Sequence, residues 1–570
     1  MRSFKEGRRL AAAVLAGMAL CAGSTFEAEG AGKPALVKLS KQDIDSYSKL
    51  SPFELKNTLI ELAQTSADAL RPKGSVLNAG RGNPNFVNTT AREAYALLTL
   101  FSAQTAKERS GVQDLGFRPE KAGIAEKLTA FLKGRSAEPG APFLRDAVQY
   151  AEQSLGLPAD DLVFELTDAA LGDFYPSPPR ILPLTEKIVL AYLAKIHFRG
   201  PTRPSGPFRL FATEGATAAM VYVFKSLREN KLLLPGDRIA IITPIFSPYL
   251  EIPLLNDYRL KPIHITGDEK KGWDVSDEEL DKLKDKRIKA LFMVNPMNPG
   301  SISMSEKTVD RIAGIIRTSR PDMIVLTDTV YAPFVDDFHD LVEKAPKNTI
   351  CVYSYSKYFG VTGWRLGVVM LQEDNVIDKL IAALPTKEQE ALHRRYLIDS
   401  TSPDKIKFID RLVMDSRDVA LAHTGGLSTP QQCITALFSL FELMDDHYAY
   451  KKSIQGILNT RSENLFRDLG IAPPKGAGQT HYYALIDIGE LAERSYGKDF
   501  LDYLRSSRSP LDILFTLAKE RQTVLLPGAG FAGPDWSVRV SLANLDDEDY
   551  AVIGKNLHAV MQEFHDDWRR

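Results

Sequence analysis

The sequence predicts an α/β fold whose large domain is built on a mostly parallel sheet. Between residues 205 and 375, apolar runs of strand length alternate with amphipathic stretches at helical spacing. Continuous apolar runs indicate strands buried on both faces, and their alternation with helices indicates a layered parallel sheet. The chain of 570 residues, 44% of them hydrophobic, exceeds the usual size of one domain, so a second domain is expected.

The predicted strands and helices of the large domain follow from these patterns. Strands are expected at 208–212, 238–243, 289–294, 323–327, 349–354 and 367–371, and helices at 216–228 and 305–317. The charged, proline-rich stretches 229–237 and 267–277 are interpreted as surface connectors.

The two chain ends are expected to form one smaller α+β domain. Residues 35–120 are interpreted as an N-terminal arm and part of this domain, and residues 425–570, with strands at 481–487 and 537–543, complete it. The large domain is predicted at 121–424, with helical insertions near 160–204 and 380–427.

Residues 1–24 have the features of an export signal. Basic residues precede an apolar run at 10–22 that is too short to span a bilayer comfortably, and small residues follow it. The adjacent Arg8 and Arg9 suggest the twin-arginine route, so the expected location is the periplasm. The alternative is a cytoplasmic protein whose first residues form a frayed amphipathic helix.

The charge and the cysteines narrow the classes of partner. A net charge of -2 and a pI near 6.5 provide no field that would recruit nucleic acid or an anionic membrane. The three cysteines show neither a CxxC motif nor metal-ligand spacing, so no disulfide framework and no metal site is predicted. The expected partners are small molecules, with no nucleic acid and, after removal of the signal, no membrane.

Lys357 is the most informative residue, because it follows Ser354 and Ser356 directly after a predicted strand, and Arg365 lies eight residues further on. A lysine whose pKa is lowered by burial can bind an aldehyde covalently, and an arginine with hydroxyl side chains can hold a phosphate. The predicted cofactor is therefore pyridoxal 5'-phosphate, with Ser354, Ser356 and Arg365 at its phosphate end. A lone lysine after serine is otherwise a surface residue.

More phosphate ligands are expected where the strand at 208–212 meets the following helix. Gly215, Ala216 and Thr217 lie at this junction, where backbone N–H groups and the helix dipole face an anion. The alternative is a glycine that serves the geometry of the turn alone.

Residues after three other strands fit the cofactor ring. Asp328 would keep the pyridine nitrogen protonated, Tyr331 and Asn298 would bind the phenolic oxygen, and Phe246 would stack on the ring. The alternatives are a helix-capping aspartate, a tight Asn-Pro turn and core aromatics. All these residues follow the carboxyl ends of strands, where ligands bind in open α/β sheets.

This ordered set resembles the fold-type I pyridoxal phosphate enzymes of the aspartate aminotransferase class, over essentially the whole chain from about residue 40. The resemblance implies that Arg539, in Ser537-Val538-Arg539-Val540-Ser541, binds the α-carboxylate of the substrate. It also implies that Asn298 binds the substrate and that Gly82 belongs to a substrate-binding strand. The segments 78–85 and 424–432 and the extra helical segments are similar to those of the aspartate β-decarboxylase family.

That family implies conversion of L-aspartate to L-alanine and CO2, with transamination to 2-oxo acids as a side activity, by homodimers or higher homo-oligomers. Arg81 is the expected ligand of the β-carboxylate because it adjoins Gly82, although it is equally interpretable as a surface arginine. One rival interpretation is a plain aminotransferase. Another is a non-catalytic binding module, which the joint presence of Lys357, Asp328 and Arg539 disfavours.

Overall fold

The computed structural model describes residues 36–70, 76–199, 206–417 and 424–570. The predicted export signal at 1–24 lies outside these ranges. Among the helices of the described ranges, none is both long enough and apolar enough to cross a membrane.

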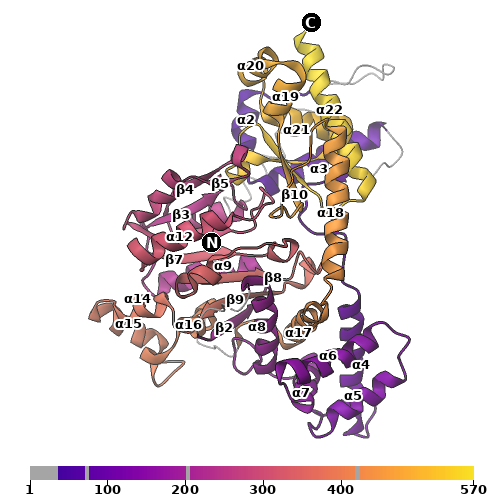
Figure 1. The fold of residues 1–570 in the computed structure, drawn as a ribbon, viewed down its shortest axis with the longest axis vertical. Helices are drawn as coiled ribbons and strands as arrows, with labels where there is room; N and C mark the ends of the chain where they lie inside the picture. Colours follow the sequence, from indigo (N-terminus) through magenta and orange to yellow (C-terminus); the bar gives the residue numbers. More distant parts are fainter. Residues whose placement is uncertain (1–35, 71–75, 200–205, 418–423) are drawn as a thin grey trace, which may run out of the picture.

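An eight-stranded sheet forms the centre of the molecule (Figure 1), and its strands follow the order β2-β9-β8-β7-β6-β3-β4-β5. The strands are β2 (Phe208–Thr213), β3 (Arg238–Thr243), β4 (Lys261–Asp268), β5 (Asp274–Val275), β6 (Ile288–Val294), β7 (Ile324–Asp328), β8 (Thr349–Ser354) and β9 (Gly367–Gln372). Neighbours from β8 to β4 run parallel, whereas β9 and β5 are antiparallel to their neighbours. The predicted α/β class and mostly parallel sheet are confirmed.

The interpretation of 267–277 as a surface connector is wrong in part. This stretch contains the end of β4 and all of β5, which pair with each other at the sheet edge. Only Ile265 and Gly267 of β4 are buried, and its other residues are partly or fully exposed. It therefore lacks the continuous apolar run that revealed the other strands.

Helices cover both faces of the sheet, because successive side chains of a strand point to opposite faces. Ile239 and Ile241 of β3 pack with α9 (Ala216–Glu229) on one face. Ala240 and Ile242 pack with α12 (Glu306–Ser319) on the other. The apolar runs of the sequence are thus strands buried from both sides.

The smaller domain, at the top of Figure 1, joins N-terminal and C-terminal segments of the described residues. Its sheet has the order β10-β13-β12, from β10 (Tyr483–Asp487), β12 (Leu526–Pro527) and β13 (Ser537–Ser541). The N-terminal segment enters through β1 (Leu77–Asn78), which pairs in parallel with β11 (Thr523–Val524), and through α3 (Pro52–Leu70), which packs on α21 (Pro510–Arg521). The expected composite domain is confirmed.

A helical layer lies at the opposite end of the molecule from the C-terminus (Figure 1). It contains α4 (Thr90–Glu108), α5 (Ile124–Lys133), α6 (Gly140–Leu155), α7 (Ala159–Leu171), α8 (Pro183–His197) and α17 (Thr429–Met444). The long helix α18 (Ala449–Asp468) runs from this layer towards the smaller domain, where it packs on α22 (Asp547–Trp568). The exact domain boundaries stay a prediction.

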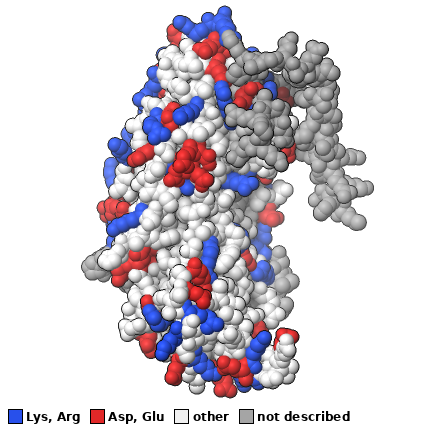
Figure 2. Space-filling model, turned by 90° about the vertical axis from the view of Figure 1, so that its right-hand side faces the viewer, with Lys and Arg blue, Asp and Glu red and all other residues white. Residues whose placement is uncertain are grey.

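The remaining helices are α2 (Lys41–Tyr47), α10 (Pro248–Glu251), α11 (Asp277–Asp281), α13 (Leu341–Lys344), α14 (Val376–Ala382), α15 (Thr386–Tyr396), α16 (Phe408–Ser416), α19 (Ile488–Tyr496) and α20 (Lys498–Ser507). On the face shown in Figure 2, acidic and basic side chains are interspersed among uncharged ones. This face therefore carries no extended field of one sign.

Candidate active site

A cavity of about 500 Å³ lies at the carboxyl ends of β3, β6, β7 and β8, between the large sheet and the smaller domain. The predicted site residues that line it are Arg81, Gly82, Ala216, Thr217, Phe246, Asn298, Asp328, Tyr331, Ser354, Ser356, Lys357, Arg365 and Arg539. The carboxyl edge of a parallel sheet thus gathers residues from distant parts of the chain, as predicted. We call this space the active cavity.

Lys357 projects into the active cavity from the segment that directly follows β8. Its Nζ donates a hydrogen bond to the backbone oxygen of Gly82 at 2.7 Å. Burial, and then the charges of Arg539 and Arg365, lower the pKa of Lys357 to about 8, and Asp328 acts in the opposite direction. At this pKa roughly a tenth of the amine is neutral at pH 7, far more than for an ordinary lysine, and the neutral form is the one that attacks an aldehyde.

Asp328 is the last residue of β7 and is almost fully buried. Its carboxylate accepts a hydrogen bond of 2.6 Å from the hydroxyl of Tyr249 and one of 3.0 Å from the backbone N–H of Val330. Burial raises the pKa of Asp328 to about 6, whereas Tyr249, Val330 and Lys357 lower it. The group is mainly ionised at neutral pH, so it can hold a protonated ring nitrogen.

A chain of polar side chains forms another wall of the active cavity. The amide of Asn298 donates to the hydroxyl of Tyr331 at 3.3 Å, and the hydroxyls of Tyr331 and Tyr483 share a hydrogen bond of 2.9 Å. Phe246 lies on the wall beside Tyr249, with their ring centroids 5.2 Å apart. The arrangement offers hydrogen bonds to a phenolic oxygen and an apolar surface to a ring.

Arg365 marks the end of the active cavity that can bind a phosphate. Its guanidinium donates to the backbone oxygens of Thr362 at 2.9 Å and Glu214 at 3.2 Å. Gly215 lies behind this guanidinium rather than on the cavity wall, and a Cβ there would come within 2.5 Å of Arg365 Nη2. Its φ of 87° also favours glycine.

Further anion ligands surround Arg365. Ala216 and Thr217 open α9 and line the active cavity, so the positive end of that helix faces the same space. Ser354 Oγ donates to Leu366 O at 3.1 Å, and it lies 2.9 Å from Ser356 Oγ. Hydroxyl, guanidinium and helix N-terminus together suit a dianionic phosphate.

Arg539 is 1% exposed and contributes a buried positive charge to the active cavity. Its Nη2 donates to Gly80 O at 3.0 Å and its Nη1 to Asn298 Oδ1 at 3.4 Å, while its Nε has no partner. Within the described ranges no carboxylate pairs with it, and it lies 4.5 Å from the ring centroid of Tyr483. A buried guanidinium that lacks a counter-ion is a ready site for a carboxylate ligand.

Two more cationic side chains, Lys56 and Arg81, line the active cavity. Burial lowers the pKa of Lys56, and the charges of Arg81 and Arg539 act in the same direction. Arg81 is exposed. Together with Lys357, Arg365 and Arg539 they make five cationic side chains on the cavity wall, against the single carboxylate of Asp328. The space is therefore suited to ligands that carry several negative charges.

Sequence analysis missed Lys56, Tyr249 and Tyr483. Tyr249 follows Phe246 by three residues within a short helical turn, a spacing that puts both side chains on one face. Tyr483 shares a face of the β10–β13 pair with Arg539, because Leu485 pairs with Arg539 and side chains alternate along a strand. Lys56 carries no comparable signal.

The side chains that line the active cavity fit pyridoxal phosphate. They supply a lysine of lowered pKa, a buried acid, donors for a phenolic oxygen and a phosphate-binding end. Each group occupies its own part of the wall. The fit depends above all on Lys357, whose lowered pKa leaves part of its amine neutral.

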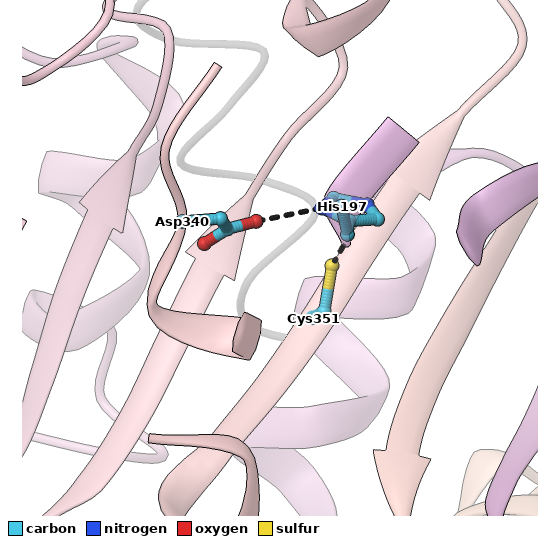
Figure 3. Close-up of side chains that lie close together, drawn as sticks. All are labelled: His197, Asp340 and Cys351. Atoms are coloured by element: carbon cyan, nitrogen blue, oxygen red, sulfur yellow. Dashed lines mark hydrogen bonds and ion pairs between the residues drawn. The ribbon is translucent and has the colours of Figure 1, made fainter. Parts of the chain in front are cut away.

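A second cluster of reactive residue types, which we call the sealed cluster, comprises His197, Asp340 and Cys351 (Figure 3). His197 Nδ1 lies 2.7 Å from Asp340 Oδ2, and Cys351 Sγ lies 3.8 Å from His197 Nε2. The hydroxyl of Thr329 lies 3.5 Å from both the imidazole and the thiol. All three members are buried and none lines the active cavity.

Comparison with known proteins agrees with this geometry. The family model described as aminotransferase class I and II matches residues 180–555. A protein of Pseudomonas sp, described as bifunctional aspartate aminotransferase and L-aspartate beta-decarboxylase, is 44% identical over 532 residues, covering 93% of this chain and 99% of that protein. The aspartate aminotransferase of Sulfolobus acidocaldarius is 28% identical and covers 54% of this chain and 65% of its own.

Solved structures support the fold. A single mutant of Thermus thermophilus aspartate aminotransferase superposes with a TM-score of 0.56 at 16% identity, covering 92% of this chain and 100% of that one. At this level of identity the similarity is one of fold. It extends over both the sheet domain and the smaller domain.

Proposed function

Because this chain belongs to aminotransferase class I and II, we propose that it removes the β-carboxylate of L-aspartate to give L-alanine and CO2, and transfers the amino group of aspartate to 2-oxo acids as a second activity. The relative from Pseudomonas sp, which carries both activities in its description, supports the proposal through its 44% identity over nearly the whole chain.

The cofactor of the family is pyridoxal 5'-phosphate. Lys357 would bind it covalently, Arg365 and the start of α9 would hold its phosphate, and Asp328 its ring nitrogen. Tyr331 and Asn298 would bind its phenolic oxygen. When bound, the group supplies a conjugated ring that accepts the electron pair released from carbon.

The positive charges of Arg539, Arg81 and Lys56 on the wall of the active cavity are the observation that carries the choice of substrate. Arg539 would hold the α-carboxylate, and Arg81 with Lys56 would hold the second carboxylate of aspartate. A monocarboxylic amino acid would leave Arg81 and Lys56 without a counter-charge. Once Arg365 binds a phosphate, the positive charges of Arg539, Arg81 and Lys56 remain, and a dicarboxylate supplies negative charges for them.

The side chains then determine what happens to the bound substrate. Lys357 Nζ, held by Gly82 O, is the base that takes the α-proton. Arg81 and Lys56 fix the direction of the bond between Cβ and its carboxylate, which breaks when it is aligned with the electron-accepting system. Water that enters instead favours release of a 2-oxo acid, so closure of the active cavity sets the partition.

The test is to incubate the pyridoxal phosphate-loaded protein with L-aspartate, without any added 2-oxo acid, and to measure the CO2 and alanine that form. We expect sustained release of both products. If no CO2 forms while aspartate and 2-oxoglutarate still exchange amino groups, the protein is a plain aminotransferase, the function that the 28% identity to the Sulfolobus acidocaldarius enzyme favours.

Assembly and location complete the proposal. We propose a homodimer or a higher homo-oligomer, which the resemblance to the aspartate aminotransferase class supports, and light scattering on the purified protein measures it directly. We propose export to the periplasm on the basis of residues 1–24. Sequencing the mature N-terminus from cell fractions tests that location, and an intact N-terminus in the cytoplasm would contradict it.

A further inference from the structure

One step of the proposed reaction has no group assigned to it. After CO2 leaves, the electron pair of the broken carbon–carbon bond must form a new bond between Cβ and a proton. Transamination has no such step. A protein that performs both reactions therefore needs a proton donor beside Cβ, and the following inference rests on the proposed function.

We propose that the hydroxyl of Tyr483 is the acid that protonates Cβ. The Cβ–carboxylate bond breaks, CO2 leaves, and the electron pair left on the substrate takes the proton of Tyr483 Oη to form the Cβ–H bond. The resulting phenolate regains a proton from solvent through the hydroxyl of Tyr331, which lies 2.9 Å away. The balance is one aspartate and one proton consumed, with one alanine and one CO2 formed.

The position of Tyr483 fits this role. The backbone of residues 80–82 passes between the two carboxylate sites, because Gly80 O accepts from Arg539, Arg81 belongs to the second site, and Gly82 O accepts from Lys357. A Cβ built on Gly82 would lie 2.8 Å from Tyr483 Oη and 3.4 Å from Lys357 Nζ. Tyr483 Oη and Lys357 Nζ therefore lie on the same side of Gly82, and an aspartate held at both sites would place its Cβ near these two proton carriers.

The other hydroxyl groups near this space are already committed. Tyr249 donates to Asp328, and Tyr331, which accepts from Asn298, shares its other hydrogen bond with Tyr483 and so serves as the relay to that hydroxyl. Lys357 serves the proton at Cα. Tyr483 remains, and it is the tyrosine of the three that stacks on Arg539, with the guanidinium 4.5 Å from its ring centroid.

The electrostatics of Tyr483 suit a donor that is restored after each turnover. Burial raises the pKa of Tyr483, whereas Arg539 and the hydrogen bond with Tyr331 lower it. Burial therefore keeps the phenol protonated at neutral pH, and the guanidinium stabilises the phenolate that forms on proton transfer. This combination is what a general acid requires.

The test compares Tyr483→Phe with Tyr482→Phe. Tyr482 is the neighbouring buried tyrosine, whose hydroxyl donates to Gly82 O at 2.9 Å but does not line the active cavity. We expect Tyr483→Phe to lower the rate of alanine formation from aspartate by about 100-fold or more. Half-transamination of L-glutamate, which needs no proton at Cβ, is expected to fall far less.

Rapid mixing of the loaded enzyme with aspartate separates bond cleavage from protonation. In Tyr483→Phe we expect CO2 to appear before alanine, with a lag that the wild type and Tyr482→Phe lack. For Tyr482→Phe we expect alanine formation and glutamate half-transamination to change by the same factor. A Tyr483→Phe enzyme that slows both reactions equally, and releases CO2 and alanine together, would overturn the inference.

A spectroscopic measurement tests the same claim without turnover. In the loaded protein labelled with tyrosine carrying ¹³C at Cζ, the resonance that disappears in Tyr483→Phe should stay that of a neutral phenol at pH 7. A phenolate signal at that pH would contradict a role as acid. If the wild type releases no CO2 from aspartate, the proposed function itself fails, and this inference fails with it.

Discussion

The active cavity and the sealed cluster both contact residues at the end of β7 and in β8, yet only the active cavity has the features of a reactive site. Asp328 faces the active cavity, and the next residue, Thr329, contacts His197 and Cys351. Both regions combine an acid with a basic or nucleophilic side chain. They differ in how much bonding capacity the protein leaves available.

Within the sealed cluster the polar atoms are satisfied by one another. His197 and Asp340 are paired at 2.7 Å, Asp340 also accepts from the backbone N–H of Val342, and all the side chains are buried (Figure 3). In the active cavity, by contrast, Arg539 keeps a donor without a partner. Residue types alone therefore do not define a site, and unsatisfied groups that face an open space do.

Burial also has opposite chemical consequences in the two regions. It disfavours the charged form of any group, so it lowers the pKa of Lys357 to about 8 and increases the fraction of neutral, nucleophilic amine. The same effect raises the pKa of the Cys351 thiol well above its usual range, with the charge of Asp340 adding to it, so the reactive thiolate does not form. Burial therefore makes the lysine more reactive and the cysteine unreactive.

The largest effect is expected from an identical substitution made in both regions. Asp328→Asn removes the charge that keeps the cofactor ring protonated, and we expect kcat for alanine formation to fall by about 10²–10³-fold, the usual loss of a preorganised electrostatic partner. Asp340→Asn, the matched control, is expected to leave kcat unchanged. Steady-state assays at saturating pyridoxal phosphate measure kcat for both variants. An equal decrease in kcat would contradict the claim that only the active cavity takes part in the reaction.

A second comparison uses two buried arginines. Arg539→Lys loses the planar donor fork that faces the substrate, so we expect the KM for aspartate to rise by about 10- to 100-fold, as for a charge-assisted hydrogen bond of about 1.5–3 kcal/mol. Arg320 is equally buried, but it is bound by Asp322 and three backbone oxygens. Arg320→Lys should therefore lower the thermal midpoint without changing KM.

The pH dependence of cofactor capture sharpens the contrast further. Only the neutral amine of Lys357 attacks an aldehyde, so we expect the rate of pyridoxal phosphate binding to the cofactor-free protein to rise about tenfold per pH unit and to level off above pH 8. Asp328 raises the pKa of Lys357, so Asp328→Asn should move the midpoint to lower pH. Stopped-flow absorbance gives the profile, and a midpoint near the ordinary lysine value would contradict the electrostatic argument.

The smallest effect concerns the sealed cluster as a structural element. In Asp340→Asn an ionic hydrogen bond to His197 is lost, and we expect the free energy of unfolding to decrease by about 1–3 kcal/mol. Urea unfolding of the cofactor-free variant, monitored by tryptophan fluorescence, measures the change. Unchanged stability would contradict this structural role, and a change in the KM for aspartate would mean that the cluster affects the active cavity.

The sequence was sufficient for the parts of the molecule that have a local signature. Buried strands such as β3 and β7 appear as continuous apolar runs, and the polar residues that follow them, such as Asp328, collect at one edge because the strands are parallel. This is why most predicted site residues line the active cavity. Gly215 supports Arg365 from behind, a role visible only in three dimensions.

The features that escaped prediction depend on contacts between distant segments. β4 and β5 form an exposed edge without a continuous apolar run. Tyr483 reaches Arg539 only because β10 pairs with β13, and Lys56 reaches the active cavity only because α3 packs on the C-terminal domain. The sealed cluster joins a helix end, a loop and a strand that share no motif. Such sites are set by tertiary packing, which the sequence pattern does not encode locally.

The central claim is that Lys357 is the nucleophilic amine of this protein. Borohydride treatment of the pyridoxal phosphate-loaded protein, followed by peptide mapping, tests it most directly. We predict one reduced cofactor adduct, on the peptide that contains Lys357, and loss of activity in proportion to labelling. An unlabelled Lys357 in a protein that still converts aspartate would contradict the account.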